Sequence, residues 1–261
     1  MNIKAVLNTL GKIAMVESVL LLLPFAVSLI YGELPSSRAF IITVLISVAV
    51  GGLLMLFTKR RSQVIYAKEG FAIVAGAWIL ISLLGALPFW ISGNIVSYID
   101  CFFETVSGFT TTGASILNDI ESLPKGMLFW RSFTHFIGGM GFLVFTMAII
   151  PNVTDRSIHI LKAEVPGPAV GKIVPKIKET AKILYLIYIV ITLLEVLLLV
   201  FGGMPVYDSF VHAFGTAGTG GFGIKGDSIS SYSPYCQVKP KKIEIEISIT
   251  SKKAESHLGQ F

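Results

Sequence analysis

Apolar residues along this chain come in five long blocks separated by more polar segments. Each block has about 19 to 23 residues, enough at about 1.5 Å per helical residue to cross a hydrocarbon core of about 30 Å. The blocks lack the alternation of barrel strands, and only helices and closed barrels satisfy every backbone N–H and C=O inside a bilayer. We therefore predict an all-α membrane protein with five spanning helices. The spans are expected at Ile13 to Tyr31, Ala39 to Phe57, Gly70 to Ser92, Ser132 to Ile150 and Ile183 to Gly203.

Composition and charge support a membrane location. Hydrophobic residues make up 53% of the chain and charged residues 14%, against about 25% charged in soluble domains. Lysine and arginine concentrate in alternate segments between the blocks, twelve against three, which places the N-terminus in the cytoplasm by the positive-inside rule. The net charge of +5 is thus interpreted as membrane topology. We expect a multi-pass protein of the cell inner (plasma) membrane, embedded in the lipid bilayer and without a nucleic-acid partner.

Two further apolar stretches are too short to cross the membrane. They are Asp100 to Gly108 (DCFFETVSG) and Asp208 to Thr216 (DSFVHAFGT). About nine helical residues reach only about 13 Å, so each stretch is expected to enter the membrane and turn back. Asp100 and Asp208 occupy positions where an N-cap carboxylate would accept the free N–H groups of a short helix. Two re-entrant pore helices are therefore predicted, both entering from the outer side.

The two stretches belong to an internal repeat with an offset of 108 residues. Residues 100–115 (DCFFETVSGFTTTGAS) align without gaps on residues 208–223 (DSFVHAFGTAGTGGFG), matching Asp, Phe, Thr and Gly. Each short helix is followed by a Thr- and Gly-rich stretch that disfavours helix. Non-helical backbone at membrane depth occurs where it is buried in protein or lines a watery cavity, and potassium filters use its carbonyls to replace the hydration shell of the ion. Gly113 and Gly221 would permit the backbone angles that such a filter loop needs.

At these residues the sequence resembles the TrkH/KtrB family of potassium transporters, and more closely its TrkH branch, over about residues 1 to 234. The motifs are FFETVSGFTTTGAS (102–115), FWRSFTHFIGGMGFLVFTMAIIP (129–151), KAEVPGPAVGKIVPKIKETAK (162–182) and HAFGTAGTGGFG (212–223). The resemblance implies four fused repeats of span, pore loop and span around one path for K⁺. It also implies a homodimer in the intact family form and a cytoplasmic nucleotide-binding ring of the TrkA type, with the basic loop 152–182 as the surface that meets it.

The resemblance assigns the filter residues of both loops. The main-chain carbonyls of these residues would bind K⁺, so the side chains matter mainly through backbone geometry. The filter strands are Thr111, Thr112 and Gly113, and Thr219, Gly220 and Gly221; the flanking residues are Thr110, Ala114, Gly218 and Phe222.

The family pattern stops near Tyr235, where the sequence becomes rich in Lys, Glu and Ser. Ile243 to Ile249 alternate with polar residues, a strand-like period that no other segment shows. We expect a chain truncated after the second pore loop by a shifted reading frame or an interrupted gene. The expected units are a two-helix unit 1–68, a first repeat 69–151, a basic linker 152–182, an incomplete second repeat 183–234 and an aberrant polar tail 235–261.

Three classes of function remain open from the residues. The first is a potassium translocation subunit. The second is a non-conducting fragment without transport activity of its own, because one chain supplies two filter loops. The third, a membrane enzyme, finds little support, since the sequence shows no pairing of nucleophile and base, no metal spacing and no phosphate loop.

Several polar and small residues in or near the apolar segments permit more than one interpretation. Glu17 is expected to reach the headgroup region, whereas Glu195 has a structural hydrogen-bonding role or a role in the ion path. His212 occupies the position equivalent to Glu104 and is interpreted as a helix contact. The glycines of the fourth span, Gly138, Gly139 and Gly141, are interpreted as close packing, with a hinge or a wall of the ion path as the alternatives. Charged residues at the outer mouth are interpreted as a cation-attracting field or as a merely solvated loop: Asp100, Glu104, Asp119 and Glu121 against Lys125 and Arg131.

Overall fold

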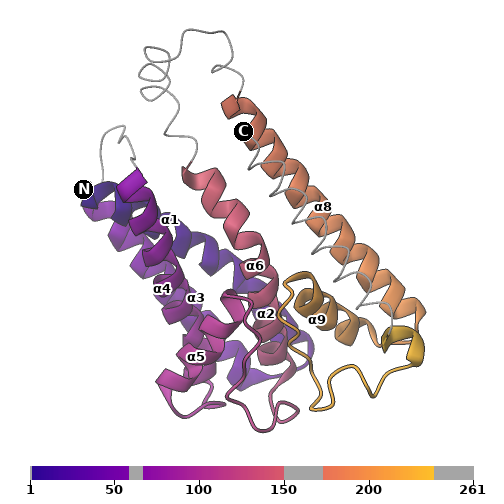
Figure 1. The fold of residues 1–261 in the computed structure, drawn as a ribbon. Coiled ribbons are helices and arrows are strands. Elements are labelled where there is room, and N and C mark those ends of the chain that lie inside the picture. The colour runs from indigo at the N-terminus through magenta and orange to yellow at the C-terminus, as the bar shows by residue number, and fades with distance from the viewer. Residues whose placement is uncertain (1, 59–66, 150–172, 238–261) are drawn as a thin grey trace.

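The computed structural model describes residues 2–58, 67–149 and 173–237. These residues form helices joined by turns, with no strand among them (Figure 1). The helices are α1 (Ile3–Leu20), α2 (Leu22–Ile30), α3 (Leu34–Phe57), α4 (Ala67–Ile91), α5 (Tyr98–Phe109), α6 (Lys125–Ile149), α8 (Ile173–Phe201) and α9 (Val206–Ala217).

Four helical segments of the described residues are long and apolar enough to cross a membrane: Ile3–Ile30, Leu34–Phe57, Lys68–Ile91 and Lys182–Phe201. They coincide with four of the expected spans. The remaining expected span falls on α6, a helix of 25 residues. The predicted all-α membrane architecture is therefore confirmed, while the number of spans stays a prediction.

The first span differs from its expected form in length and continuity. It begins at Ile3, ten residues before the apolar block, and it is interrupted at Leu21, between α1 and α2. Pro24 explains the interruption, because proline has no N–H to donate to the carbonyl four residues earlier and its ring crowds that carbonyl. Proline is tolerated in a first helical turn, and α2 therefore restarts at Leu22.

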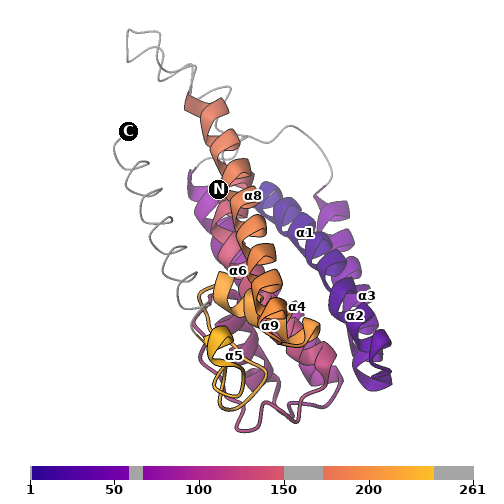
Figure 2. The same cartoon turned by 90° about the vertical axis from the view of Figure 1, so that its right-hand side faces the viewer.

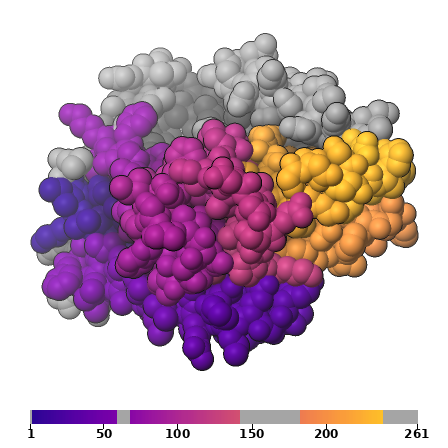
Figure 3. All heavy atoms as spheres, turned by 90° about the horizontal axis from the view of Figure 1, so that it is seen from below, coloured from indigo at the N-terminus to yellow at the C-terminus, as the bar shows by residue number. Residues whose placement is uncertain are grey.

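The helices run between two ends of the molecule. In Figure 1, the start of α1, the end of α3, the start of α4 and the start of α8 lie at one end, and the turn between α2 and α3 lies at the other. The segments that follow α5 and α9 also lie at this second end. Figure 2 shows the same arrangement from the side. Figure 3 looks onto this end, where the first loop region (magenta) lies beside the second (yellow).

Helices α1 and α3 are held close together by two glycines. A Cβ atom on Gly11 would lie 2.8 Å from the carbonyl oxygen of Gly51, and a Cβ on Gly51 would lie 2.8 Å from the carbonyl oxygen of Gly11. Small residues at such a crossing allow the backbones to approach, which is how helices gain packing energy in a bilayer. The N-terminal pair of helices is thus a tightly packed unit.

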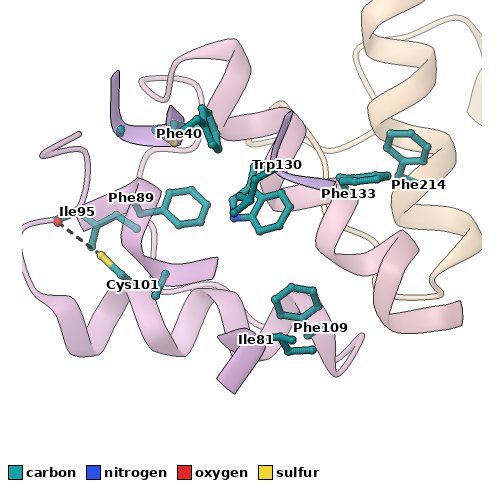
Figure 4. Packing of buried hydrophobic residues seen from close by; sticks show 13 residues of the cluster. Phe40, Ile81, Phe89, Ile95, Cys101, Phe109, Trp130, Phe133 and Phe214 are labelled. Carbon is teal, nitrogen blue, oxygen red and sulfur yellow. Dashed lines mark hydrogen bonds between the residues drawn. The ribbon is translucent and has the colours of Figure 1, made fainter. Parts of the chain in front are cut away.

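Helix α6 joins this N-terminal unit to the two short helices α5 and α9. Its buried Trp130 and Phe133 pack with Phe40 of α3, Phe109 of α5 and Phe214 of α9 in one hydrophobic cluster (Figure 4). The indole Nε1–H of Trp130 also donates to the carbonyl of Gly85 in α4, at 2.9 Å. The core therefore lies around α6, and the two pore helices are positioned against it.

The N-terminal end of α6 is capped by a residue of the α2–α3 turn. The carboxylate of Glu33 accepts hydrogen bonds from the backbone N–H groups of Lys125, at 2.6 Å, and Gly126, at 2.9 Å. The ammonium of Lys125 lies 4.1 Å from the ring centroid of Tyr31. The hydroxyl of Tyr207, in the first turn of α9, donates to the carbonyl of Lys125 at 2.5 Å. Three segments distant in sequence therefore meet at the first turn of α6.

The expected linker and tail fall largely outside the described residues. The structure describes nothing of residues 152–172 or 238–261, so the strand-like pattern of Ile243 to Ile249 is not tested. The first residues of the expected tail are described, and Cys236 is buried against Leu199 and Met204. The chain at this point thus packs on the end of α8. The proposed unit boundaries stay predictions.

Candidate ion-filter loops

The two short apolar stretches form the helices α5 and α9, each of 12 residues. At about 1.5 Å per residue, each helix reaches about 18 Å and is too short to cross a bilayer. Both helices contact α6, which lies between them (Figures 1 and 2).

The N-terminal caps differ from the prediction, and Asp100 and Asp208 are not N-caps. The cap of α5 is Ser97, whose side chain accepts a hydrogen bond from the N–H of Asp100, at 3.4 Å. The cap position of α9 is Pro205, which makes no side-chain cap. Both aspartates lie one turn further on, inside their helices. The prediction was wrong because each helix begins two residues before its aspartate, so the carboxylate lies too late to serve as the cap.

Asp208 instead anchors the chain that follows the second loop. Its carboxylate accepts a hydrogen bond from the hydroxyl of Tyr232, at 2.8 Å. Burial and this hydrogen bond raise the pKa of Tyr232 above its ordinary value, so the hydroxyl remains a donor at neutral pH. The segment after the second loop is thereby tied to the first turn of α9.

The C-terminal ends of α5 and α9 have the same hydrogen-bond pattern. After α5, the N–H of Thr111 bonds the carbonyl of Gly108 and the N–H of Thr112 bonds that of Ser107. After α9, the N–H of Thr219 bonds the carbonyl of Thr216 and the N–H of Gly220 bonds that of Gly215. Each pattern is a Schellman motif, in which the residue after the cap adopts a left-handed conformation. Residues that are 108 positions apart in the sequence therefore make equivalent hydrogen bonds.

The backbone angles of the two loops also match. The φ angle is +55° at Thr111 and +58° at Thr219, and +74° at both Gly113 and Gly221. Positive φ is a genuine outlier for a β-branched residue, because its Cβ crowds the backbone. Two threonines at equivalent positions share this unusual φ angle, which indicates that both loops adopt the same backbone conformation.

The two loops meet at Gly113 and Gly220. A Cβ atom on Gly113 would collide with the carbonyl oxygen of Gly220, so no other residue fits there without a backbone shift. Beyond the contact, the side chains of the first loop are exposed at Thr110, Thr112 and Ala114. In the second loop, Thr219 and Gly221 are exposed, whereas Phe222 is only 3% exposed.

The carbonyl groups of both loops accept no hydrogen bond from the residues that the structure describes. Among the hydrogen bonds of the residues that the structure describes, none has a carbonyl oxygen of residues 110–114 or 218–222 as its acceptor. Most residues of these loops are exposed or partly exposed, so water or a bound cation can pair with their carbonyls. These loops therefore retain acceptor capacity at the place where the sequence predicts cation binding.

A buried ion pair lies directly behind the loops. The Nε of Arg131 in α6 lies 2.5 Å from the Oε1 of Glu104 in α5, and the two side chains are 2% and 0% exposed. The interpretation of these two residues as part of a solvated outer mouth was wrong. Each lies inside the protein because the other neutralises its charge and because hydrogen bonds satisfy its remaining polar atoms.

The glycines of α6 pack against both pore helices, as predicted for two of the three. A Cβ on Gly138 would collide with the carbonyl of Phe109 at the end of α5, and a Cβ on Gly139 would lie 3.2 Å from the Cα of Gly218. His135, one turn earlier, stacks on Phe222 with ring centroids 3.9 Å apart. His135 therefore lies against the second loop.

The structure also shows the surroundings of Glu17 and His212. Glu17 is only 3% exposed, packed inside the helical bundle, so the expectation that it reaches the headgroup region was wrong. His212 packs against the chain that follows the second loop, with its ring facing Tyr232 edge-on at 5.3 Å between centroids, so the expected helix contact stays a prediction. Among the residues described, no group of three or more His, Cys, Asp or Glu side chains could hold a metal ion.

Comparison with known proteins identifies similar sequences and structures. A protein-family model described as TrkH, cation transport protein, matches residues 36–240. The Trk system potassium uptake protein TrkH of Salmonella typhimurium is 37% identical over 234 residues, which cover 89% of this chain and 48% of that protein. The Trk system potassium uptake protein TrkG of Escherichia coli is 33% identical over 236 residues, covering 90% and 48%.

A solved structure has the same fold over nearly the whole chain. The crystal structure of the potassium transporter TrkH from Vibrio parahaemolyticus superposes with a TM-score of 0.76 at 29% identity, covering 95% of this chain and 49% of that one. The chain thus spans about half the length of the curated relatives it matches.

Proposed function

Because this chain belongs to the TrkH family of cation transport proteins, we propose that it acts in potassium ion transport across the membrane, as a pore-forming subunit of a Trk-type uptake system. The family consists of ion transporters and not of enzymes. K⁺ would be the transported ion, held by backbone carbonyls of two filter loops. The filter residues are Thr111, Thr112, Gly113, Thr219, Gly220 and Gly221, flanked by Thr110, Ala114, Gly218 and Phe222.

The unpaired carbonyls of the two loops carry this proposal. They occur on two loops with matching bonds and φ angles, each at the end of a helix too short to cross the membrane. Carbonyl oxygens without protein partners can replace the hydration shell of K⁺. The C-terminal ends of α5 and α9 add partial negative charge at the same place.

A second candidate is a non-conducting form of the same protein. One chain supplies two loops, whereas a ring that surrounds an ion uses about four. Two copies, or a copy paired with another subunit, would supply the remaining loops.

The partners and location extend the proposal. We expect a protein of the inner membrane with a cytoplasmic N-terminus, dimeric in the full family form. A cytoplasmic nucleotide-binding ring of the TrkA type would meet the basic segment 152–182. The division into the units 1–68, 69–151, 152–182, 183–234 and 235–261 belongs to the same proposal.

Growth of potassium-uptake-deficient cells at low external K⁺, together with K⁺ flux into liposomes that contain the purified chain, tests the function. The decisive variant is Gly113→Ala, which places a Cβ against the carbonyl of Gly220. The matched control is Gly93→Ala, with φ +75° against +74° at Gly113 but nothing within 4 Å of its added Cβ. We expect growth and flux from the native chain and from Gly93→Ala, and loss of both in Gly113→Ala. No flux from the native chain would favour the non-conducting candidate.

A further inference from the structure

The ion pair behind the loops has one partner for each loop. The carboxylate of Glu104 accepts hydrogen bonds from the hydroxyl of Ser115, at 3.0 Å, and from the N–H of Ile116, at 3.0 Å. Both donors belong to the chain that leaves the first loop. Glu104 thereby fixes this chain to α5, behind the filter residues.

Arg131 holds the second loop in the same way. Its Nη1 donates to the carbonyl of Gly223, at 3.2 Å. Its guanidinium carbon lies 3.5 Å from the ring centroid of Phe222. A planar guanidinium can donate in several directions and stack on an aromatic ring at the same time, which a lysine cannot reproduce.

The two contact points are equivalent positions of the repeat. Ser115 and Gly223 are 108 residues apart, and each follows the positive-φ glycine of its loop by two residues. The residue equivalent to Glu104 in the second repeat is His212, and a Cβ on Gly223 would lie 3.5 Å from its ring. In the part of the chain that the structure describes, one ion pair therefore serves both loops.

Stability alone does not account for such a pair. Two charges lose most of their hydration when they are buried, so a buried ion pair is often no more stabilising than apolar residues of the same volume. A charged pair does fix geometry, because its hydrogen bonds require defined donor and acceptor positions. Because Glu104 holds one loop and Arg131 holds the other, the geometry that their pair fixes is the separation of the two loops.

We propose that Glu104 and Arg131 are positioning residues that set the distance between the two filter loops and thereby the preference for K⁺ over Na⁺. This inference rests on the proposed function. The two ions differ in radius by a fraction of an ångström, so a carbonyl cage discriminates between them only if its two sides keep their spacing. The pair is electrically neutral as a whole, so it holds the loops without repelling a cation.

The test measures ion preference and fold stability separately on the full chain in lipid nanodiscs. Thermal unfolding is followed in increasing KCl or NaCl at constant ionic strength, because an ion that binds the folded state raises the melting temperature. The ratio of the apparent K⁺ and Na⁺ affinities is the readout. We expect Glu104→Gln and Arg131→Lys each to lower this ratio by about tenfold, the effect of losing about 1.4 kcal/mol.

Two further variants separate positioning from folding. The double variant Glu104→Arg with Arg131→Glu restores an ion pair with the charges exchanged. We expect it to recover the melting temperature but not the ratio of K⁺ to Na⁺ affinity, because a carboxylate in α6 cannot accept the hydrogen bonds of Ser115 and Ile116. Gly51→Val is the control, because Gly51 packs α3 on α1 and its neighbours at an added Cβ belong to α1 and not to the loops. It should lower the melting temperature and leave the ratio unchanged.

The outcomes distinguish the two proposals. If the native chain prefers K⁺ and the Glu104 and Arg131 variants keep that preference while they melt earlier, the pair is only structural and the positioning role is overturned. If the native chain itself shows no preference for K⁺, the proposed function fails, and the inference fails with it. Should Glu104→Gln not fold, Ser115→Ala removes one donor to Glu104 and leaves the ion pair, and an unchanged ratio there would also count against positioning.

Discussion

Thr111 and Thr219 occupy a backbone conformation that glycine usually supplies. Each is the left-handed residue of a Schellman motif at the end of a pore helix. The left-handed conformation costs a residue with a Cβ roughly 1–2 kcal/mol. Strain of this kind persists where the surrounding structure imposes it and where function uses it. Two threonines at one repeat position fit this description.

Replacing Thr111 by glycine should therefore stabilise the fold. We expect Thr111→Gly to raise the free energy of unfolding by about 0.5–1 kcal/mol, since the relief of left-handed strain exceeds the extra entropy that glycine gives the unfolded chain. The measurement is a chemical or thermal unfolding curve in detergent.

The control for this prediction is the next residue. Thr112 has no positive φ, so Thr112→Gly should lower the free energy of unfolding. Equal destabilisation by both substitutions would show that Thr111 is not strained.

Among single residues, the sequence predicted the glycines of the loops but not the pairing of the two buried charges. The loops and the equivalence of Gly113 with Gly221 followed from the repeat, because a shared backbone requires glycine at the same place. The pairing of Glu104 with Arg131 did not follow, since the partners lie 27 residues apart on different helices. A usable signal was present, because a charge in an apolar segment requires a partner. The Ser97-to-Asp100 spacing is likewise a capping-box pattern that would have identified the cap.

Among the helical elements, the crossing of α1 and α3 depends on one glycine face. Gly51 faces Gly11, whereas the neighbouring Gly52 has nothing within 4 Å of an added Cβ. Gly51→Val should force the helices apart and lower the melting temperature in detergent. The expected loss in free energy of unfolding is that typical of overpacking, about 1–3 kcal/mol. Gly52→Val tests the specificity of this effect and should leave the melting temperature nearly unchanged. A similar loss in both variants would mean that valine destabilises α3 by itself.

Span positions were predictable at this scale, but helix ends were not. Hydropathy identifies the residues that are apolar enough for the bilayer interior. A helix continues beyond them for as long as its backbone hydrogen bonds continue. Lys4, Asn8 and Lys12 are too polar for the apolar block, yet they lie in α1. The break at Leu21 also went unpredicted, because Pro24 was counted as one apolar residue among many.

For the molecule as a whole, the distribution of basic residues predicts its orientation in the membrane. Asn118 lies in the outer segment after the first loop, and Lys4 lies at the start of α1; both are exposed. We expect Asn118→Cys to react with a membrane-impermeant maleimide on intact cells, and Lys4→Cys to react only after permeabilisation. The native Cys101 and Cys236 are buried and serve as an unlabelled background. Labelling of Lys4→Cys in intact cells would reverse the predicted topology.

The relation between distant segments was the least predictable feature of the whole molecule. The repeat indicated that two loops share a conformation, but it did not indicate that α6 lies between α5 and α9. That placement depends on the packing of aromatic side chains from five helices around Trp130 and Phe133, and side-chain packing leaves no periodic signature in the sequence.

The cap that Glu33 provides for α6 gives the α2–α3 turn an influence on the position of Arg131. Glu33 fixes the first turn of α6, and Tyr207 attaches α9 to the same turn. Arg131 follows six residues later, less than two helical turns away. A small rotation of this helix about its axis would swing the guanidinium away from both of its loop contacts. Residues of a distant turn thus govern the angular setting of the helix that carries Arg131.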